Sequence, residues 1–114
     1  MVDLQITFSG KAVYVGGQRM EVEYPVRDAF LASDKVIVLY DPDSYTERFG
    51  QFQNLVAFTP DGKKVWTAEL PTTTSGDRYY RIVLRGQLIA SSIYSYECEI
   101  DCATGKITAK LFLK

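Results

Sequence analysis

Two strand-turn-strand segments share a Gly-Lys turn, and these turns recur about 43 residues apart, at Gly62-Lys63 and Gly105-Lys106. A period of this length is typical of one four-stranded β-meander, the unit of a propeller blade. A chain of 114 residues holds fewer than three such units, whereas a closed propeller needs at least about four. The repeat therefore predicts a chain of β-meanders that cannot close a propeller by itself.

Alternation of apolar and polar residues predicts most of the other strands. The first 26 residues are expected to form a small three-stranded meander with a hairpin turn at Gly16-Gly17. Its third strand, residues 20–26, should end at Pro25 or lie on a sheet edge, because proline lacks an N–H group. Residues 36–40 are apolar on both faces, which is typical of a strand in the middle of a structure.

We therefore predict a single all-β domain over residues 1–114, built from antiparallel meanders. Two blade-like four-stranded sheets, about residues 26–70 and 79–113, follow an N-terminal hairpin and pack as a sandwich or an incomplete propeller. The alternative is a flattened barrel in which the first and last strands pair. Residues 28–35 are expected to link two strands, with a short helical turn as the alternative, and residues 41–53 form a connection that is long for a β-protein.

The turn motifs resemble those of pyrroloquinoline-quinone-type propeller repeats and of outer-membrane assembly lipoproteins. The matching residues are Ala57, Asp61, Gly62, Lys63 and Trp66 in the first unit, and Asp101, Thr104, Gly105 and Lys106 in the second. Ala109 stands near the place of Trp66, so the second unit lacks the tryptophan. An N-terminal Phe-Ser-Gly-Lys and a C-terminal Ile-Asp-x-x-Thr-Gly-Lys-Ile also resemble small stand-alone bacterial proteins of unassigned function. These resemblances imply a blade-like fold but no activity.

The charge and histidine content exclude several classes of function. The chain has no histidine, which removes every nucleophile that imidazole activates. Its 13 basic and 14 acidic side chains nearly balance, so we expect neither nucleic acid nor a membrane surface as a partner. The N-terminal residues carry Asp3 and no basic leader, which argues against a signal peptide and favours a cytoplasmic location.

Cys98 and Cys102 are expected to carry free thiols. Along a strand their Cα atoms would lie about 13 Å apart, too far for a disulfide. Without histidine or a second cysteine pair they cannot complete a usual zinc site, so we predict no metal and no cofactor.

Glu97, Glu99 and Asp101 alternate along one predicted strand and should share a face. A glycosidase-like pair or a calcium site is one interpretation. A solvated outer face is the favoured one, because charged side chains are mostly exposed. We therefore predict no catalytic residue.

Aromatic residues in the long connection give the predicted binding site. Tyr45, Arg48, Phe49 and Phe52 lie there, and tyrosine and arginine concentrate binding energy in protein interfaces. The alternative is that the connection packs these rings over an open end of the sheet. Trp66 is assigned to the core.

The sequence favours a non-enzymatic protein-binding module, for example a bacterial accessory or toxin-neutralising immunity protein. The alternative is a small-ligand or carbohydrate-binding protein, for which Tyr94 and Tyr96 offer a stacking surface. An enzyme that uses the three acidic residues ranks third. A monomer or weak dimer is expected, because Lys106, Lys110 and Lys114 blunt the last strand as an edge.

Overall fold

The computed structural model describes residues 4–44 and 50–113, which form three antiparallel sheets and one short 3-10 helix, η1 (Pro42–Ser44). The N-terminal sheet contains β1 (Ile6–Ser9), β2 (Ala12–Val15) and β3 (Gln18–Glu21). The middle sheet contains β4 (Val26–Ala32), β5 (Lys35–Tyr40), β6 (Leu55–Phe58) and β7 (Lys64–Thr67). The C-terminal sheet contains β8 (Tyr79–Leu84), β9 (Ile89–Ser92), β10 (Tyr96–Ile100) and β11 (Ile107–Phe112). The prediction of an all-β fold with two four-stranded sheets is confirmed, and the described strands close no barrel.

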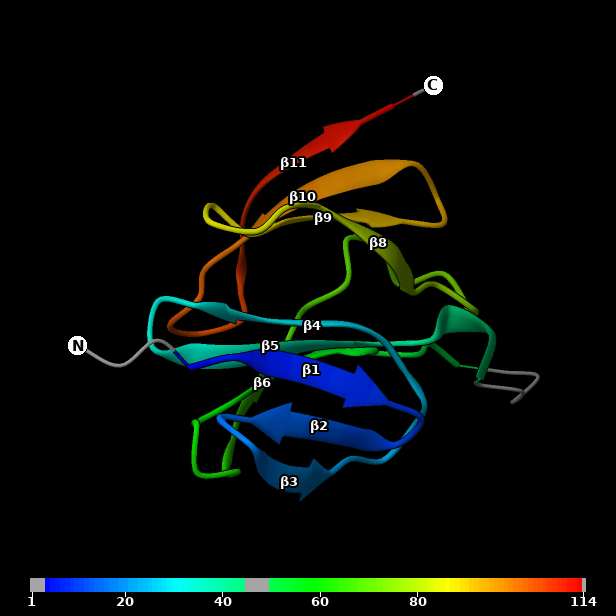
Figure 1. The fold of residues 1–114 in the computed structure, drawn as a ribbon. Helices are drawn as coiled ribbons and strands as arrows, with labels where there is room; N and C mark the ends of the chain where they lie inside the picture. Colours follow the sequence, from blue (N-terminus) through cyan, green and yellow to red (C-terminus); the bar gives the residue numbers. More distant parts are fainter. Residues whose placement is uncertain (1–3, 45–49, 114) are drawn as a thin grey trace.

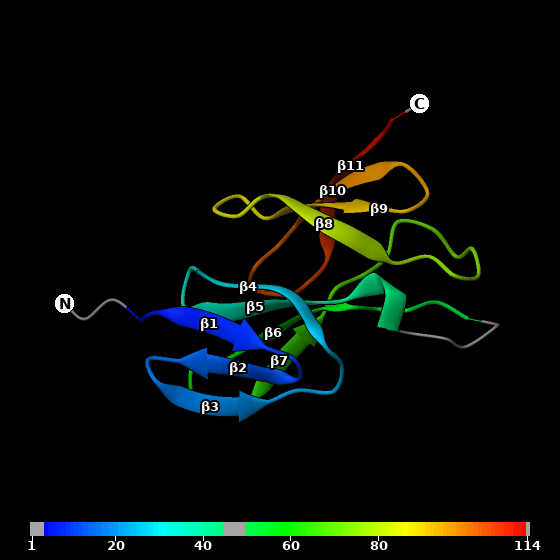
Figure 2. The ribbon, with the colours of Figure 1, turned by 45° about the vertical axis from the view of Figure 1, so that its right-hand side comes forward.

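The three sheets are stacked, with the middle sheet between the other two (Figures 1 and 2). The apolar strand β5 explains this position. Ile37 and Leu39 lie in the core shared with the C-terminal sheet, whereas Val36 and Val38 lie in the core shared with the N-terminal sheet. Because successive side chains of a strand point to opposite faces, one apolar strand serves both cores.

Each Gly-Lys turn contacts the sheet before it in the chain. A Cβ atom added at Gly62 would lie 3.6 Å from the sulfur of Met20, on β3. One added at Gly105 would lie 2.7 Å from the indole ring of Trp66, on β7, so only glycine fits beneath this ring. Trp66 is buried, as predicted, and its Nε1–H donates to the carbonyl oxygen of Cys102 at 2.7 Å. The repeated turn therefore joins neighbouring sheets as well as neighbouring strands.

The connection between β3 and β4 differs from the prediction. The third strand ends at Glu21, four residues before Pro25. The N–H groups of Val22 and Val26 donate to the carbonyl oxygens of Lys11 and Gly10, both at 2.9 Å, which holds residues 22–26 against the β1–β2 turn. The chain thus leaves its edge position early and crosses to the middle sheet.

The link between β4 and β5 is also shorter than expected. β4 runs to Ala32 and β5 begins at Lys35, so only Ser33 and Asp34 connect them. Ser33 adopts a positive φ of 56°, the conformation of a tight hairpin turn. Residues 28–35 therefore form strand and turn, with no helical turn.

Candidate interaction surface

The long connection after β5 is tied to the segment before β8. The N–H of Gly50 donates to the Ser75 hydroxyl at 3.0 Å, and the carbonyl oxygen of Gly50 accepts from the N–H of Gly76 at 2.7 Å. The N–H of Phe52 donates to the carbonyl oxygen of Asp77 at 3.0 Å. These bonds attach one end of the connection to the loop that leads into the C-terminal sheet.

Of the four predicted binding residues, Phe52 lies in the core. Its side chain is only 4% exposed, and its ring meets Tyr24 edge-on with 4.9 Å between ring centroids. The guanidinium of Arg78 lies 5.9 Å from the same ring centroid. The packing interpretation therefore describes Phe52. Tyr45, Arg48 and Phe49 lie outside the described residues, and their binding role stays a prediction.

A buried polar cluster lies beneath this connection. The Asn54 side chain donates to the carbonyl oxygens of Tyr40 at 3.0 Å and Tyr79 at 2.7 Å, and accepts from the Tyr79 N–H at 2.9 Å. The buried Asp77 carboxylate accepts from the Thr72 hydroxyl at 2.6 Å and the Arg78 N–H at 2.9 Å. Partners inside the fold thus satisfy both side chains. Asn54 joins the middle and C-terminal sheets, whereas Asp77 holds together the loop of residues 72–78.

Tyr94 and Tyr96 contact different partners. The Tyr94 hydroxyl donates to the carbonyl oxygen of Ser75 at 3.1 Å. The Tyr96 ring packs against Phe112 with 5.1 Å between centroids, and the Lys110 ammonium lies 5.2 Å from its centroid. Each ring thus already belongs to a contact within the fold.

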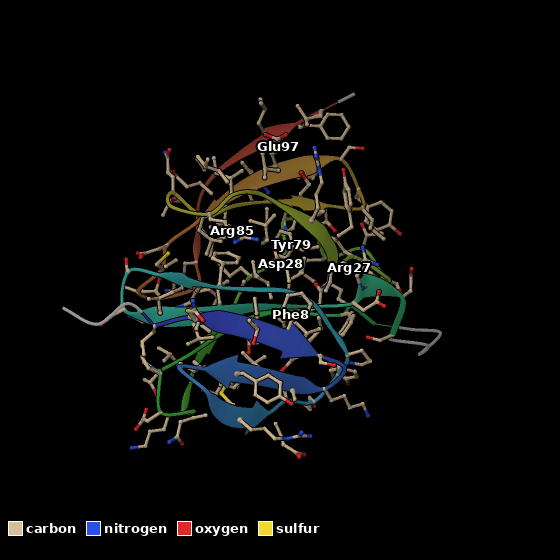
Figure 3. All side chains as sticks on the ribbon, in the orientation of Figure 1. Phe8, Arg27, Asp28, Tyr79, Arg85 and Glu97 are labelled. Atoms are coloured by element: carbon tan, nitrogen blue, oxygen red, sulfur yellow. The ribbon has the colours of Figure 1, made fainter. Side chains whose placement is uncertain are left out.

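The C-terminal sheet has one face covered by the middle sheet and one face turned away from it, here called the outer face. Cys98 and Ala90 pair across β10 and β9 and lie in the core. Alternation places on the outer face the side chains Arg81, Ile89, Ser91, Glu97, Glu99, Ala109 and Leu111. Figure 3 shows Glu97 beyond β10, on the opposite side of the sheet from Tyr79.

The predicted carboxylate row is only partly formed. Glu97 and Glu99 share the outer face, as expected. Asp101 leaves it, because the register shifts between Glu99 and Ile100 and the chain then turns. Its carboxylate accepts from the N–H of Ala103 at 2.8 Å, which is a turn-forming contact.

The two outer-face carboxylates differ in their partners. Glu99 accepts from the Gln87 side-chain amide at 2.6 Å and from the Thr108 hydroxyl at 3.0 Å. Glu97 is half-buried, and its carboxylate has no hydrogen bond or ion pair within residues 4–44 and 50–113. The neighbouring Ser91 is only 4% exposed, and its hydroxyl has no hydrogen-bond partner in the described part of the chain. The outer face thus holds polar groups that its own residues leave unpaired.

The outer face corresponds to the face of the middle sheet that packs on the C-terminal sheet. The two sheets can be aligned by their Gly-Lys turns and by the residues that pair between neighbouring strands. In this alignment, four apolar positions of the middle sheet have counterparts in the C-terminal sheet. Leu39, Leu55, Ala57 and Trp66 correspond to Ser91, Glu97, Glu99 and Ala109. Two of the four apolar positions of the middle sheet therefore carry carboxylates in the C-terminal sheet, one carries a hydroxyl group, and the tryptophan is an alanine.

β11 is exposed on both faces. Leu111 is 61% exposed and Phe112 is 54% exposed, and Leu113 follows them at the surface. The Lys110 ammonium donates to the carbonyl oxygen of Pro71 at 3.0 Å, on the inner side of the sheet. Of the three lysines expected to blunt this edge, Lys110 thus points back toward the fold, and Lys114 lies outside the described residues.

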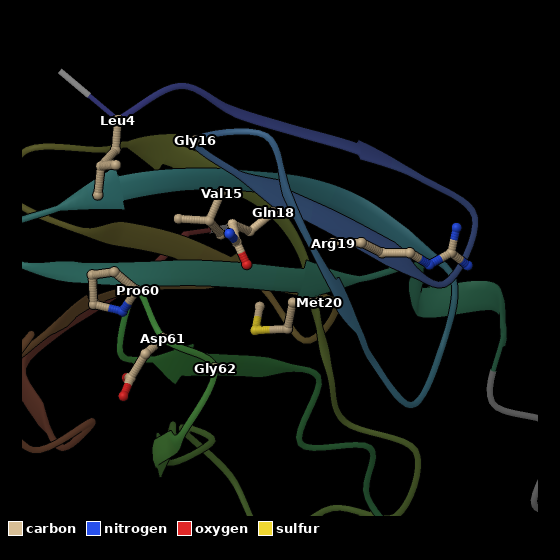
Figure 4. Close-up of a pocket in the computed structure, with 9 residues that line it drawn as sticks. All are labelled: Leu4, Val15, Gly16, Gln18, Arg19, Met20, Pro60, Asp61 and Gly62. Carbon is tan, nitrogen blue, oxygen red and sulfur yellow. The ribbon is translucent and has the colours of Figure 1, made fainter. Parts of the chain in front are cut away.

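Several grooves lie on the described surface. One, of about 640 Å³, separates the N-terminal sheet from the β6–β7 turn; Leu4, Val15, Met20 and Pro60 line it with Gln18 and Asp61 (Figure 4). Another, of about 280 Å³, lies on the outer face, and its lining consists of Gln87, Ile89, Glu97, Glu99, Ala109, Lys110 and Leu111. A groove of about 450 Å³ lies between β11 and residues 69–71. The last two grooves flank β11.

Both cysteines carry free thiols, with Cys98 buried in β10 and Cys102 in the turn that follows. Burial raises the pKa of each thiol above its ordinary value. Residues 4–44 and 50–113 contain no group of three side chains suited to hold a metal ion. No helix in this part of the chain is long and apolar enough to cross a membrane.

Comparison with known proteins gives one match. No curated protein and no solved structure matches the chain. A family model described as "Domain of unknown function (DUF7957)" matches residues 3–112. Because this match spans nearly the whole sequence, the chain belongs to the DUF7957 family of domains of unknown function.

Proposed function

We propose that the protein is a non-enzymatic binding module that acts through contact with another protein, and that the outer face and β11 form its contact surface. The observation that carries this proposal is a run of exposed large apolar side chains at the end of β11. Leu111, Phe112 and Leu113 are 61%, 54% and 40% exposed, and the first two are the most exposed large apolar side chains on the described surface. Exposed apolar side chains that adjoin one another favour an interaction site.

The other sheets offer no comparable surface. Both faces of the middle sheet are covered. The side of the N-terminal sheet that faces away from the core carries Thr7, Tyr14 and Arg19, which are polar. The C-terminal sheet therefore differs from both in presenting apolar side chains around a few polar groups, the usual composition of an interface.

A more specific role is part of the same proposal: an accessory or immunity-type protein in a bacterial cytoplasm. The two free thiols support a reducing compartment. The resemblance of the sequence to stand-alone bacterial proteins supports such a role.

An affinity capture with matched variants tests the proposal. Leu111→Ser removes an apolar side chain that is 61% exposed on the proposed surface, and Val65→Ser removes one that is 40% exposed on β7. Each should change the free energy of unfolding by less than about 1 kcal/mol, because both side chains are exposed. The unmodified protein and Val65→Ser should retain a stoichiometric protein partner. Leu111→Ser should reduce the amount of partner retained by about tenfold or more. Equal retention by both variants would contradict the proposed surface.

The groove in Figure 4 supports a second candidate, a small-ligand or carbohydrate-binding protein. Its volume of about 640 Å³ lies within the ordinary range of ligand pockets. The Arg19 side chain extends away from it and pairs with Glu21 at 3.2 Å, which leaves Gln18 and Asp61 as polar groups near the ligand. A fragment screen by nuclear magnetic resonance tests this function. A fragment that shifts the signals of Met20 and Gly62, and whose binding is abolished by Met20→Ala, would favour it.

A further inference from the structure

The edge of β11 is the least protected strand edge in the described structure. The other outer strands are shortened or interrupted: β1, β3 and β7 have four residues each, and β4 and β8 contain register shifts. The one register shift of β11 lies at its beginning, so residues 109–112 pair regularly with β10. Natural proteins protect exposed edges with short strands and bulges. β11 is longer than β1, β3 and β7, with six residues, and its bulge lies before residues 109–112.

Main-chain groups of β11 point away from the sheet. The N–H of Leu113 donates to the carbonyl oxygen of Ser95 at 2.7 Å, so Leu113 faces β10. Main-chain hydrogen bonding alternates along an antiparallel strand. The N–H and carbonyl groups of Leu111 and Ala109 therefore also point toward β10, whereas those of Lys110 and Phe112 point away from the sheet. The start of the edge is closed, because the Glu69 carboxylate accepts from the N–H of Ile107 at 2.8 Å. The open edge is therefore residues 109–113.

The groove beside this edge is acidic and reachable across one small side chain. Ala109 lies between the open edge and Glu99, its pairing partner on β10. Glu97 and Glu99 line the groove on the outer face with Gln87, Ile89, Ala109, Lys110 and Leu111. The Lys110 ammonium leaves this face and donates to the carbonyl oxygen of Pro71. A long basic side chain that entered from the edge would cross Ala109 and extend along Leu111 toward the two carboxylates. The Glu97 carboxylate, which has no partner in the described residues, leaves this face without a cation.

We propose that the open edge of β11 receives an extended basic segment of a partner protein as a fifth strand of the C-terminal sheet, with an arginine or lysine of that segment bound by Glu97 and Glu99. Main-chain hydrogen bonds to Lys110 and Phe112 supply affinity, and the outer-face groove selects alternate side chains. This inference rests on the proposed protein-binding function and specifies its partner.

A second copy of the chain fits this site less well. On β11, the side chains that lie on the outer face are those of Ala109 and Leu111, and neither is basic. Lys110 lies on the other face, with its ammonium at Pro71. Pairing of two β11 edges therefore supplies no cation to Glu97 and Glu99.

A synthetic peptide provides a defined probe. The peptide is threonine-arginine-valine-arginine-valine-arginine-threonine with blocked ends, and its control carries glutamate in place of arginine. Titration followed by nuclear magnetic resonance should shift the amide signals of β11, Glu97 and Glu99, and should slow the hydrogen exchange of the Lys110 and Phe112 amides by about tenfold or more. The glutamate peptide should bind at least about tenfold more weakly, because like charges then meet at the acidic groove. Equal binding of the two peptides, or the absence of any shift at peptide concentrations of several millimolar, would overturn the proposal.

Two sets of variants test the two components separately. Lys110→Pro removes an outward N–H but no bond to β10, and edge strands accept proline in this orientation. Lys110→Thr is its control, since it removes the same side chain and keeps the N–H. We expect at least about tenfold weaker peptide binding for Lys110→Pro than for Lys110→Thr.

Glu97→Gln with Glu99→Gln should weaken binding of the arginine peptide by about fivefold or more without changing the fold. If Lys110→Pro binds as well as Lys110→Thr, or the double glutamine variant binds like the unmodified protein, the proposal is wrong.

The same variants separate this inference from the proposed function. If a captured partner depends on Leu111 but is retained equally by Lys110→Pro and Lys110→Thr, the protein is a binding module that does not use strand addition. If the unmodified protein forms a dimer that Lys110→Pro disrupts and that excludes the arginine peptide, a second copy is the occupant and the proposal fails. A partner that is lost with both Leu111→Ser and Lys110→Pro, together with binding of the arginine peptide, supports both.

Discussion

The side chain of Asn54 pairs with the main chain of Tyr79 in the way that one strand pairs with another. Its Oδ1 accepts from the Tyr79 N–H at 2.9 Å and its Nδ2 donates to the Tyr79 carbonyl oxygen at 2.7 Å. Asn54 directly precedes β6 of the middle sheet, and Tyr79 begins β8 of the C-terminal sheet. One side-chain amide therefore joins the two sheets inside the core.

Replacement of this amide should destabilise the fold. Asn54→Leu leaves the buried N–H and carbonyl groups of Tyr79 without partners, and each unsatisfied group costs about 1–3 kcal/mol. We expect the free energy of unfolding to fall by about 3 kcal/mol or more, measured by urea denaturation. Gln53→Ala is the control, because this exposed side chain makes one hydrogen bond, to Ala68, and its loss should cost less than about 1 kcal/mol. Equal effects of the two changes would show that the buried pairing is unimportant.

Gly105→Ala should destabilise the protein through its contact with Trp66. The added methyl group would lie 2.7 Å from the indole ring, and the residue has a positive φ of 77°. Overpacking together with backbone strain predicts a loss of about 2–4 kcal/mol. Gly86→Ala is the matched control, since nothing lies within 4 Å of the added atom and φ is not positive. A thermal midpoint unchanged in Gly105→Ala would contradict the packing of this turn on the middle sheet.

The stability of the protein should fall at alkaline pH. Burial raises the pKa of the Cys98 thiol and of the Tyr79 phenol, so the folded state holds both protons more tightly than the unfolded chain. The stabilisation is complete below the unfolded pKa values and is lost as the pH rises above about 9 for Cys98 and about 10 for Tyr79. The expected slope is at most about 1.4 kcal/mol per pH unit for each group. Cys98→Ala should flatten the curve between about pH 9 and 10, and an unchanged slope there would exclude this thiol as the cause.

The predicted loop site can be tested against Phe52. Phe52→Ala removes a buried ring and should lower the free energy of unfolding by about 3–5 kcal/mol. If residues 41–53 are also a binding surface, Arg48→Ala and Phe49→Ala should weaken partner capture by about 1–2 kcal/mol each. The same two changes should alter stability by less than about 0.5 kcal/mol. Denaturant midpoints and capture measured on all three variants distinguish the roles, and a silent Arg48 with a destabilising Phe49 would remove the loop as a site.

The turn spacing and the two-faced apolar strand were sufficient to predict the middle and C-terminal sheets. Local chemistry determines both features: a glycine turn ends each unit, and β5 must be covered on two sides. The pairing of Asn54 with Tyr79 could not be predicted, because its partners lie 25 residues apart and a single asparagine has no pattern. The end of β3 was also missed, since hydrogen bonds to Lys11 and Gly10, rather than Pro25 alone, determine where the chain turns.

The acidic row was recognised from its alternation, but its setting was not. Glu97 and Glu99 form a face with the apolar side chains of other strands, and only the register of β9, β10 and β11 brings Ile89 and Leu111 beside them. Ala109 in the place of Trp66 was the signal in the sequence, because it indicates that the second unit does not continue the stack in the same way.

The correspondence between the two four-stranded sheets also determines what the outer face can pack against. A sheet that repeated the apolar face of the middle sheet would present a surface suited to another apolar sheet. Ser91, Glu97 and Glu99 in place of Leu39, Leu55 and Ala57 make that surface costly to bury without a matching charge. These three side chains thus disfavour the stacking of a further apolar sheet on this face, and leucine or alanine in their place should increase self-association.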